Sequence, residues 1–141
     1  MTSQSIAVEA RHDLTAREVD GLENLIDEFN ISRTGHNDAR QLAFLAHIDS
    51  ELVGAVAGFT WGGFGELRQV WIREEQRGRG LGREIMSRAI DEARSRGCAA
   101  LYLATYDFQA PGFYAKLGFR LVCQIQDRPI GHTDNFMVLE L

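Results

Sequence analysis

The chain has 141 residues, of which 45% are apolar and 25% charged, a composition typical of a globular protein and not of a disordered or fibrous one. No apolar run approaches the roughly 20 residues that a membrane-spanning helix needs, so we expect no membrane partner. The net charge of −5 argues against a general nucleic-acid binder, which usually presents a basic face, and is compatible with a cationic substrate.

The amino-terminal segment MTSQSIAVEARHDLT lacks the basic and apolar regions of a signal peptide, so the cytoplasm is the expected location. Cys98 and Cys123 lack the spacing of metal ligands or of a redox pair, and their apolar neighbours predict two small core residues in a reducing compartment. No histidine, cysteine and carboxylate residues have metal-ligand spacing, so we expect no metal. The chain shows no repeat, linker or low-complexity tract, which predicts a single domain over residues 1–141.

The first elements follow from hydrophobic periodicity. Alternating residues predict a strand over residues 6–10. A helix follows, because Thr15 and Glu18 have the spacing of a capping box and apolar residues then recur at helical spacing. The apolar stripe of this helix consists of Val19, Leu22, Ile26 and Phe29. The runs QLAFLAHID and ELVGAVAGFTW predict a hairpin that turns at Asp49–Ser50, and the run ELRQVWIRE predicts a third strand.

From Gly80 onward the apolar period becomes helical, which predicts a helix that ends at Gly97. The nearly continuous apolar run AALYLATY is typical of a strand covered on both faces. Pro111 and Gly118 delimit a short helix, and FRLVCQI and NFMVLEL predict two final strands. The predicted order is β-α-β-β-β-α-β-α-β-β, a mixed α/β (α+β) arrangement with one strand–helix–strand unit among hairpins.

The segment VWIREEQRGRGLGREI joins a predicted strand to a predicted helix through alternating glycines and arginines. Unpaired N–H groups at the start of a helix, together with the helix dipole, favour a bound phosphate or pyrophosphate. A P-loop is excluded, because Arg83 and Glu84 stand where it needs Lys and Ser or Thr. A dinucleotide fingerprint is incomplete, although Asp107 lies at about the distance of its ribose-binding acid, so an NAD-binding unit stays an alternative.

The stretch Arg77-Gly78-Arg79-Gly80-Leu81-Gly82 resembles the R/Q-x-x-G-x-G/A signature of the GNAT superfamily of acetyl-CoA-dependent N-acetyltransferases. Downstream, APGFYAKLGF over residues 110–119 is similar to the A-x-x-x-Y-x-x-x-G-F segment of that superfamily. The order of the predicted elements also matches, so the resemblance covers essentially the whole chain. It implies a single GNAT-like domain with a mixed, mostly antiparallel central sheet and helices on both faces.

The resemblance implies two contacts with acetyl-CoA. The backbone amides of the turn formed by Arg77, Gly78, Arg79, Gly80, Leu81 and Gly82 would bind the pyrophosphate. The strand edge around Val70 and Ile72, which would splay from the next strand, would pair with the pantetheine arm like an added strand. A main-chain N–H near Ile72 would donate to the acetyl oxygen during transfer.

Two side chains are candidates for proton transfer. Tyr114 aligns with the tyrosine that in many relatives protonates or hydrogen-bonds the departing sulfur, and the alternative is a core aromatic residue like Phe113. Glu66 lies where some relatives carry a catalytic glutamate, and strand alternation puts it on the face of Val70 and Ile72 unless a bulge intervenes. A solvated acid, with proton removal through water, is the alternative for Glu66.

The remaining candidates have weaker support. His132 and Asp134 lie in the last loop, which in this fold can line the acceptor side, although a loop histidine more often has no special role. Trp61 and Phe64 could form an aromatic wall for the acceptor or pack at the end of the sheet. Asp107 stands where the superfamily frequently has asparagine, and a negative charge there is unexpected beside an anionic ligand.

The leading hypothesis is direct acetyl transfer from acetyl-CoA to a primary amine of a small molecule, because nothing in the chain resembles an appended protein-recognition module. A protein or peptide amine is the second choice, and an acyl-CoA-binding module without catalysis is the alternative from another class. The segment over residues 30–40 is short for the acceptor-binding helix of many relatives. The acceptor site is therefore either open or completed by a second subunit of a homodimer.

Overall fold

The computed structural model describes residues 4–141, so residues 1–3 of the amino-terminal segment considered above lie outside it. The chain forms two compact units, of which one ends at His36 and the other spans Asn37–Leu141. Among the helices of the described chain, none combines the length and the apolar character needed to cross a membrane.

The first unit contains helix α1, Ala16–Thr34, which begins at the predicted capping box. The N–H of Glu18 donates to the Thr15 hydroxyl at 3.1 Å, and the N–H of Thr15 donates to the Glu18 carboxylate at 3.3 Å. Gly35 ends the helix in a left-handed conformation, its N–H bonded to the Ile31 carbonyl at 2.8 Å. The predicted apolar stripe is present but exposed, from 43% at Val19 to 58% at Phe29.

The predicted strand over residues 6–10 is wrong, because the structure has irregular backbone there. A strand requires a neighbouring strand for its N–H and C=O groups, and alternation in sequence cannot supply that neighbour. Ile6 and Val8 are 90% and 91% exposed, so their alternation with polar residues buries no face.

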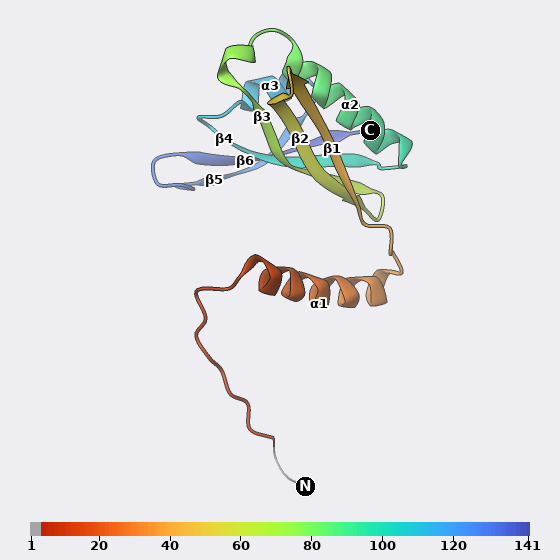
Figure 1. The fold of residues 1–141 in the computed structure, drawn as a ribbon, viewed down its shortest axis with the longest axis vertical. Helices are drawn as coiled ribbons and strands as arrows, with labels where there is room; N and C mark the ends of the chain where they lie inside the picture. The colour runs from red at the N-terminus through yellow and green to blue at the C-terminus, as the bar shows by residue number, and fades with distance from the viewer. Residues whose placement is uncertain (1–3) are drawn as a thin grey trace. The chain divides into compact units, whose positions relative to one another are not determined.

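The second unit is built on a six-stranded sheet with the order β1-β2-β3-β4-β6-β5 (Figure 1). The strands are Arg40–Ile48 (β1), Glu51–Trp61 (β2), Phe64–Ile72 (β3), Ala100–Tyr106 (β4), Arg120–Gln126 (β5) and Thr133–Glu140 (β6). The helices are Leu81–Ser95 (α2) and Pro111–Lys116 (α3), and a short 3-10 turn, Glu74–Gln76, follows β3. These elements confirm the predicted hairpin at Asp49–Ser50, where both residues have positive φ, as a tight hairpin turn requires.

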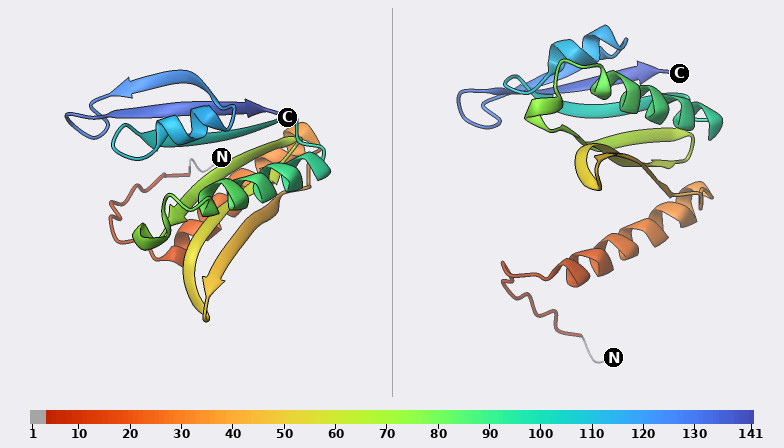
Figure 2. Two further views of the ribbon diagram at one scale, coloured as in Figure 1. Left: turned by 90° about the horizontal axis from the view of Figure 1, so that it is seen from above. Right: turned by 45° about the horizontal axis from the view of Figure 1, so that its top comes forward.

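The sheet is mostly antiparallel, and its one parallel pair is β3 with β4. Within the described chain this pairing covers only Phe64–Glu66 against Ala100–Tyr102, so the carboxyl halves of the two strands separate. Figure 2 shows the halves of the sheet diverging beyond this point. The predicted splay of the strand around Val70 and Ile72 is therefore confirmed.

One core joins α2 and α3 to the sheet. Its most buried residues include Met86 and Ala89 of α2, together with Leu101 of β4, and Tyr114 of α3 belongs to the same cluster. The helical apolar period predicted from Gly80 onward is confirmed, because the buried residues of α2 recur at helical spacing: Ile85, Met86, Ala89, Ile90 and Ala93. Both helices thus pack on one face, as the views in Figure 2 also show.

The opposite face of the sheet carries a row of aromatic rings. Tyr102 stacks on Phe64 with ring centroids 6.3 Å apart, and on Phe136 at 5.8 Å. Cys98 is buried as predicted, and burial raises the pKa of its thiol. Cys123 is exposed, which corrects the prediction of two core cysteines. Every residue of β5, the edge strand that carries Cys123, is exposed, so its apolar character in sequence was a poor indicator of burial.

Candidate active site

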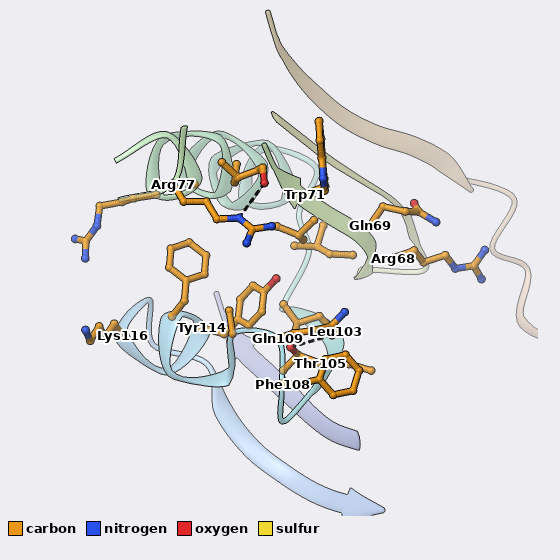
Figure 3. A pocket seen from close by; sticks show the side chains of 18 of the residues that line it. Arg68, Gln69, Trp71, Arg77, Leu103, Thr105, Phe108, Gln109, Tyr114 and Lys116 are labelled. Carbon is orange, nitrogen blue, oxygen red and sulfur yellow. Dashed lines mark hydrogen bonds between the residues drawn. The ribbon is translucent and has the colours of Figure 1, made fainter. Parts of the chain in front are cut away.

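The separation of β3 from β4 opens a pocket of about 900 Å³. Its walls come from the separated halves of both strands, from the turn that precedes α2, and from the loop and helix that follow β4. The pocket contains the hydroxyl-bearing ring of Tyr114, the glycine turn and the edge of β3 around Val70 and Ile72. The structure thus brings together residues that lie far apart in the sequence (Figure 3).

The turn before α2 presents a row of free backbone donors. Gly80 precedes the helix with φ of 83°, and Gly78 has φ of 75°. Residues that have a Cβ rarely adopt this backbone conformation. The N–H groups of residues 78–83 donate to no backbone oxygen or side chain within residues 4–141. At the amino end of a helix such donors, reinforced by the helix dipole, favour an anion.

Arg77 has a different position from the rest of the turn. Its N–H donates to the Glu74 carbonyl at 3.1 Å, and its Nε donates to the Ile72 carbonyl at 3.1 Å (Figure 3). The side chain therefore ties the turn to the end of β3. Of the amides predicted for a pyrophosphate, the Arg77 amide is already used inside the protein, which leaves those from Gly78 onward.

Gly82 is required by close packing and not by its φ angle. A Cβ at this position would lie 3.3 Å from the Phe113 ring and 3.6 Å from Ile72. By contrast, a Cβ at Gly78 or Gly80 would meet no atom within 4 Å. The backbone there is open on the pocket side, so a bulky anion can approach the amides.

The edge of β3 is available to a ligand on one side only. The N–H of Arg73 donates to the Val53 carbonyl of β2 at 2.8 Å. This bond determines which of the preceding residues direct their backbone groups toward β2 and which direct them away. In an antiparallel pair, every second residue directs both its backbone groups away from the partner strand. Val70 and Ile72 therefore direct their N–H and C=O groups toward the separation from β4, although Arg77 occupies the Ile72 carbonyl.

Tyr114 lies on α3 with only 7% of its surface exposed, in edge contact with the rings of Phe113 and Phe119. Burial disfavours the phenolate and raises the pKa of Tyr114 to about 12. No hydrogen bond from its hydroxyl to another residue of the described chain is present, and the residue lines the pocket. Figure 3 shows the hydroxyl directed toward the interior of the pocket.

Glu66 does not share the face of Val70 and Ile72, which corrects the alternation inferred from sequence. The pairing of β3 with β2 shifts by one residue at Arg68, because Leu67 opposes Gly58 while Gln69 opposes Ala57. A bulge of this kind reverses the facing of all residues on one side of it. Leu67, Val70 and Ile72 all pack against the core, so the preceding Glu66 faces the other way.

The Glu66 carboxylate forms an ion pair with Arg68 at 3.6 Å, and its side chain is 27% exposed. It contributes, after burial, to raising the pKa of the neighbouring Tyr102. Among the described residues, Glu66 is not part of the pocket wall, and neither is any other Asp or Glu. The structure therefore places this candidate base beside the transfer pocket and not in it.

His132 of the last loop is outside the pocket wall, and so is Asp134, which belongs to β6 and not to the loop as predicted. His132 Nδ1 lies 3.0 Å from the Asp107 carboxylate, so Asp107 is directed toward the loop after β5 and not toward the pocket. The Asp107 carboxylate, whose charge would be unfavourable beside an anionic ligand, is therefore paired with His132 instead. Asp134 is buried and forms an ion pair with Arg128 at 3.3 Å.

The pocket wall carries positive charge in a protein that is negative overall. Arg68, Arg77, Arg83 and Lys116 line it, against a net charge of −5 for the chain. Sequence analysis did not identify Lys116, nor the lining residues Trp71, Leu103, Thr105, Phe108 and Gln109. For Trp61 and Phe64 the sequence left an acceptor wall and packing at the end of the sheet both open. Phe64 stacks on Tyr102, and neither residue is among the described lining residues.

Comparison with known proteins places the chain in a family. Residues 7–119 match the acetyltransferase (GNAT) family. The blasticidin-S acetyltransferase of Streptomyces morookaense is 40% identical over 94 residues, which cover 64% of this chain and 68% of that protein. An acetyltransferase structure from Bacillus cereus ATCC 14579 aligns with a TM-score of 0.79 at 23% identity, covering 94% of this chain and 98% of that one.

An aminoglycoside 6′-N-acetyltransferase complexed with coenzyme A aligns with a TM-score of 0.65 at 19% identity, covering 89% of this chain and 92% of that one. At these identities the two solved structures establish the fold. The family match extends over more than half of the chain and includes the glycine turn, the splayed strands and Tyr114. The chain therefore belongs to the acetyltransferase (GNAT) family and is an acyltransferase of that type.

Proposed function

We propose that the protein transfers an acetyl group from acetyl-CoA to the primary amine of a small molecule, by direct attack through a tetrahedral intermediate. The observation that carries the proposal is the row of unbonded amides at residues 78–83, which opens into the same pocket as the Tyr114 hydroxyl. The relative from Streptomyces morookaense, named for a small-molecule acceptor, supports this choice of acceptor. The coenzyme A complex of the aminoglycoside enzyme supports the choice of donor.

The residues of the pocket fit acetyl-CoA, which supplies the reactive thioester. The amides of Gly78 to Arg83 would hold the pyrophosphate, and the absence of Cβ atoms at Gly78 and Gly80 allows close approach. Arg83 and Lys116 add positive charge at the pocket wall. The free backbone groups of Val70 would pair with the amides of the pantetheine arm like an added strand.

Within this frame the protein's own groups have separate tasks. The N–H of Ile72 would donate to the oxygen that becomes negative as the amine attacks. The Tyr114 phenol, with a pKa of about 12, stays neutral at working pH and would donate a hydrogen bond to the departing sulfur. Removal of the ammonium proton is assigned to water in the pocket, with Glu66 acting at most through that water, because Glu66 is paired with Arg68 on the other face.

We also propose that residues 1–141 act as a single domain, because the family match over residues 7–119 crosses the boundary at His36.

The test follows release of the CoA thiol with acetyl-CoA and a panel of primary amines, and identifies the products by mass spectrometry. We expect N-acetylated product from at least one small amine, with one acetyl group per thiol released. Tight binding of acetyl-CoA without turnover on any small amine, peptide or protein would favour the catalytically silent module instead. A protein that binds NAD and does not bind acetyl-CoA would overturn the proposal entirely.

A further inference from the structure

Phe108, in the loop between β4 and α3, is a large apolar residue that is exposed to water. Its side chain lines the pocket, yet 58% of its surface is exposed to water. Exposure of a large aromatic side chain forfeits roughly 1.5 kcal/mol or more of burial free energy. An exposed ring in the wall of a ligand pocket is therefore a candidate for contact with the ligand.

The Phe108 ring is held in place by two other rings. Tyr106 stacks on it with centroids 5.3 Å apart and planes at 15°, and His132 contacts it edge-on at 4.9 Å. His132 is in turn fixed by its 3.0 Å contact with Asp107. We call the three rings of Tyr106, Phe108 and His132 the aromatic platform.

The backbone on both sides of Phe108 is also fixed. The N–H of Asp107 donates to the Thr133 carbonyl at 3.0 Å, and the N–H of Gln109 donates to the Tyr106 carbonyl at 2.9 Å. The Gln109 side chain accepts from the N–H of Tyr106 at 2.9 Å. A surface loop with these bonds presents its exposed ring in one orientation, which lowers the entropic cost of binding.

The platform is at the opposite end of the pocket from Lys116. In Figure 3 the side chain of Lys116 lies at one end, and those of Arg68 and Phe108 lie toward the other. Tyr114 lies between the two ends in this view. A donor bound with its pyrophosphate at the turn and its sulfur near Tyr114 leaves the Phe108 end for the acceptor.

We infer that the aromatic platform is an acceptor subsite that stacks against a flat aromatic or heteroaromatic ring carried by the amine. The inference rests on the proposed function, since it names the substrate class of the same site. A second exposed aromatic residue, Trp71, lines the same pocket with 43% of its surface exposed. Stacked or edge-to-face contacts with a bound ring exceed the contribution of the buried area alone.

The test compares two amines that differ in ring planarity, 2-phenylethylamine and 2-cyclohexylethylamine, at saturating acetyl-CoA and one pH. We expect kcat/KM to favour the aromatic amine by roughly 2- to 12-fold in the wild-type enzyme. The Phe108→Leu variant should lose this preference, and Phe108→Tyr should keep it. Phe64→Leu is the matched control, because Phe64 is exposed and stacked on a tyrosine but lies outside the pocket wall.

Two results would overturn the subsite. One is turnover of both amines by the wild type without preference for the flat ring, which requires no variant. The other is a Phe108→Leu variant that raises KM for acetyl-CoA and leaves the amine preference intact, since the ring would then contact the donor. Failure of the proposed function is distinguishable, because it appears as an absence of turnover on every amine.

Discussion

At the scale of single residues, burial of the Tyr114 side chain sets its protonation state and thereby its chemical role. Desolvation raises the pKa of Tyr114 from 10.0 to about 12, so the phenol is protonated throughout the range in which an amine acceptor loses its proton. The proposed role of its hydroxyl is therefore that of a hydrogen-bond donor to the ligand. The motif in the sequence identified this residue, but its burial depends on α3 packing against Phe119.

Tyr114 should therefore titrate at an unusually alkaline pH. The absorbance of tyrosinate, measured in the wild type and in Tyr114→Phe, should give a difference curve with a midpoint near 12. Tyr114→Phe should also lower kcat by about 100-fold, whereas Tyr102→Phe, which removes a hydroxyl outside the pocket wall, should not. A difference midpoint at 10 would contradict the burial argument, and an unchanged kcat would remove the hydroxyl from the mechanism.

One β-bulge reverses the face of the sheet on which the Glu66 side chain lies. The sequence placed it correctly on β3, but the bulge at Arg68 depends on pairing with β2, which no local pattern reveals. The change from Glu66 to Gln should lower kcat by less than about tenfold, because general-base catalysis by a positioned group contributes 100-fold or more. A larger loss, with the acidic limb of the pH–rate profile removed, would show that Glu66 is the base after all.

At the scale of elements, the site depends on how α2 begins. The glycine and arginine pattern predicted both the strand-to-helix turn and its free amides, because helix starts and positive φ angles are local properties. The Arg77 amide already donates to the Glu74 carbonyl and its Nε to the Ile72 carbonyl, two contacts that the motif does not specify. Phe108 was missed because its contact with His132 is a tertiary one, and Gln109 because no motif specifies its two bonds to Tyr106.

A side chain at Gly80 should block the anion site. Gly80→Val should weaken binding of acetyl-CoA by roughly 10- to 100-fold, which corresponds to loss of one or more hydrogen bonds to a charged group. Gly97→Val is a closely matched control, because Gly97 follows the other end of α2 with φ of 80° against 83° and equally open space. Calorimetric titration measures both variants, and an equal loss of affinity in the two would attribute the effect to backbone strain alone.

At the scale of the whole molecule, sheet geometry and charge act together. The single parallel pair follows from the predicted strand–helix–strand unit, but the position of β6 between β4 and β5 was not predicted, because chain order does not specify it. The strand predicted over residues 6–10 failed for lack of a pairing partner. The splay concentrates four cationic side chains around one pocket of a chain with net charge −5. The cytoplasmic location and the homodimer stay predictions from sequence.

This charge distribution predicts a dependence on ionic strength. Screening lengths fall from about 30 Å at 0.01 M salt to about 8 Å at 0.15 M, so attraction of an anionic donor into the pocket weakens. We expect KM for acetyl-CoA to rise across this range while kcat changes little. A charge-reversing change, Lys116→Glu, should raise KM at low salt more than at high salt, and a KM independent of salt would contradict the electrostatic role of the pocket wall.

The proposed activity depends above all on the amides of residues 78–83 binding the pyrophosphate of the donor. The most direct measurement is amide NMR of the ¹⁵N-labelled protein, titrated with acetyl-CoA and, separately, with S-acetylpantetheine, which lacks the pyrophosphate. We expect acetyl-CoA to shift the resonances of residues 78–83 strongly, and S-acetylpantetheine to leave them in place while it shifts those near Val70 and Tyr114. Saturation with acetyl-CoA without movement of the turn amides would contradict this expectation.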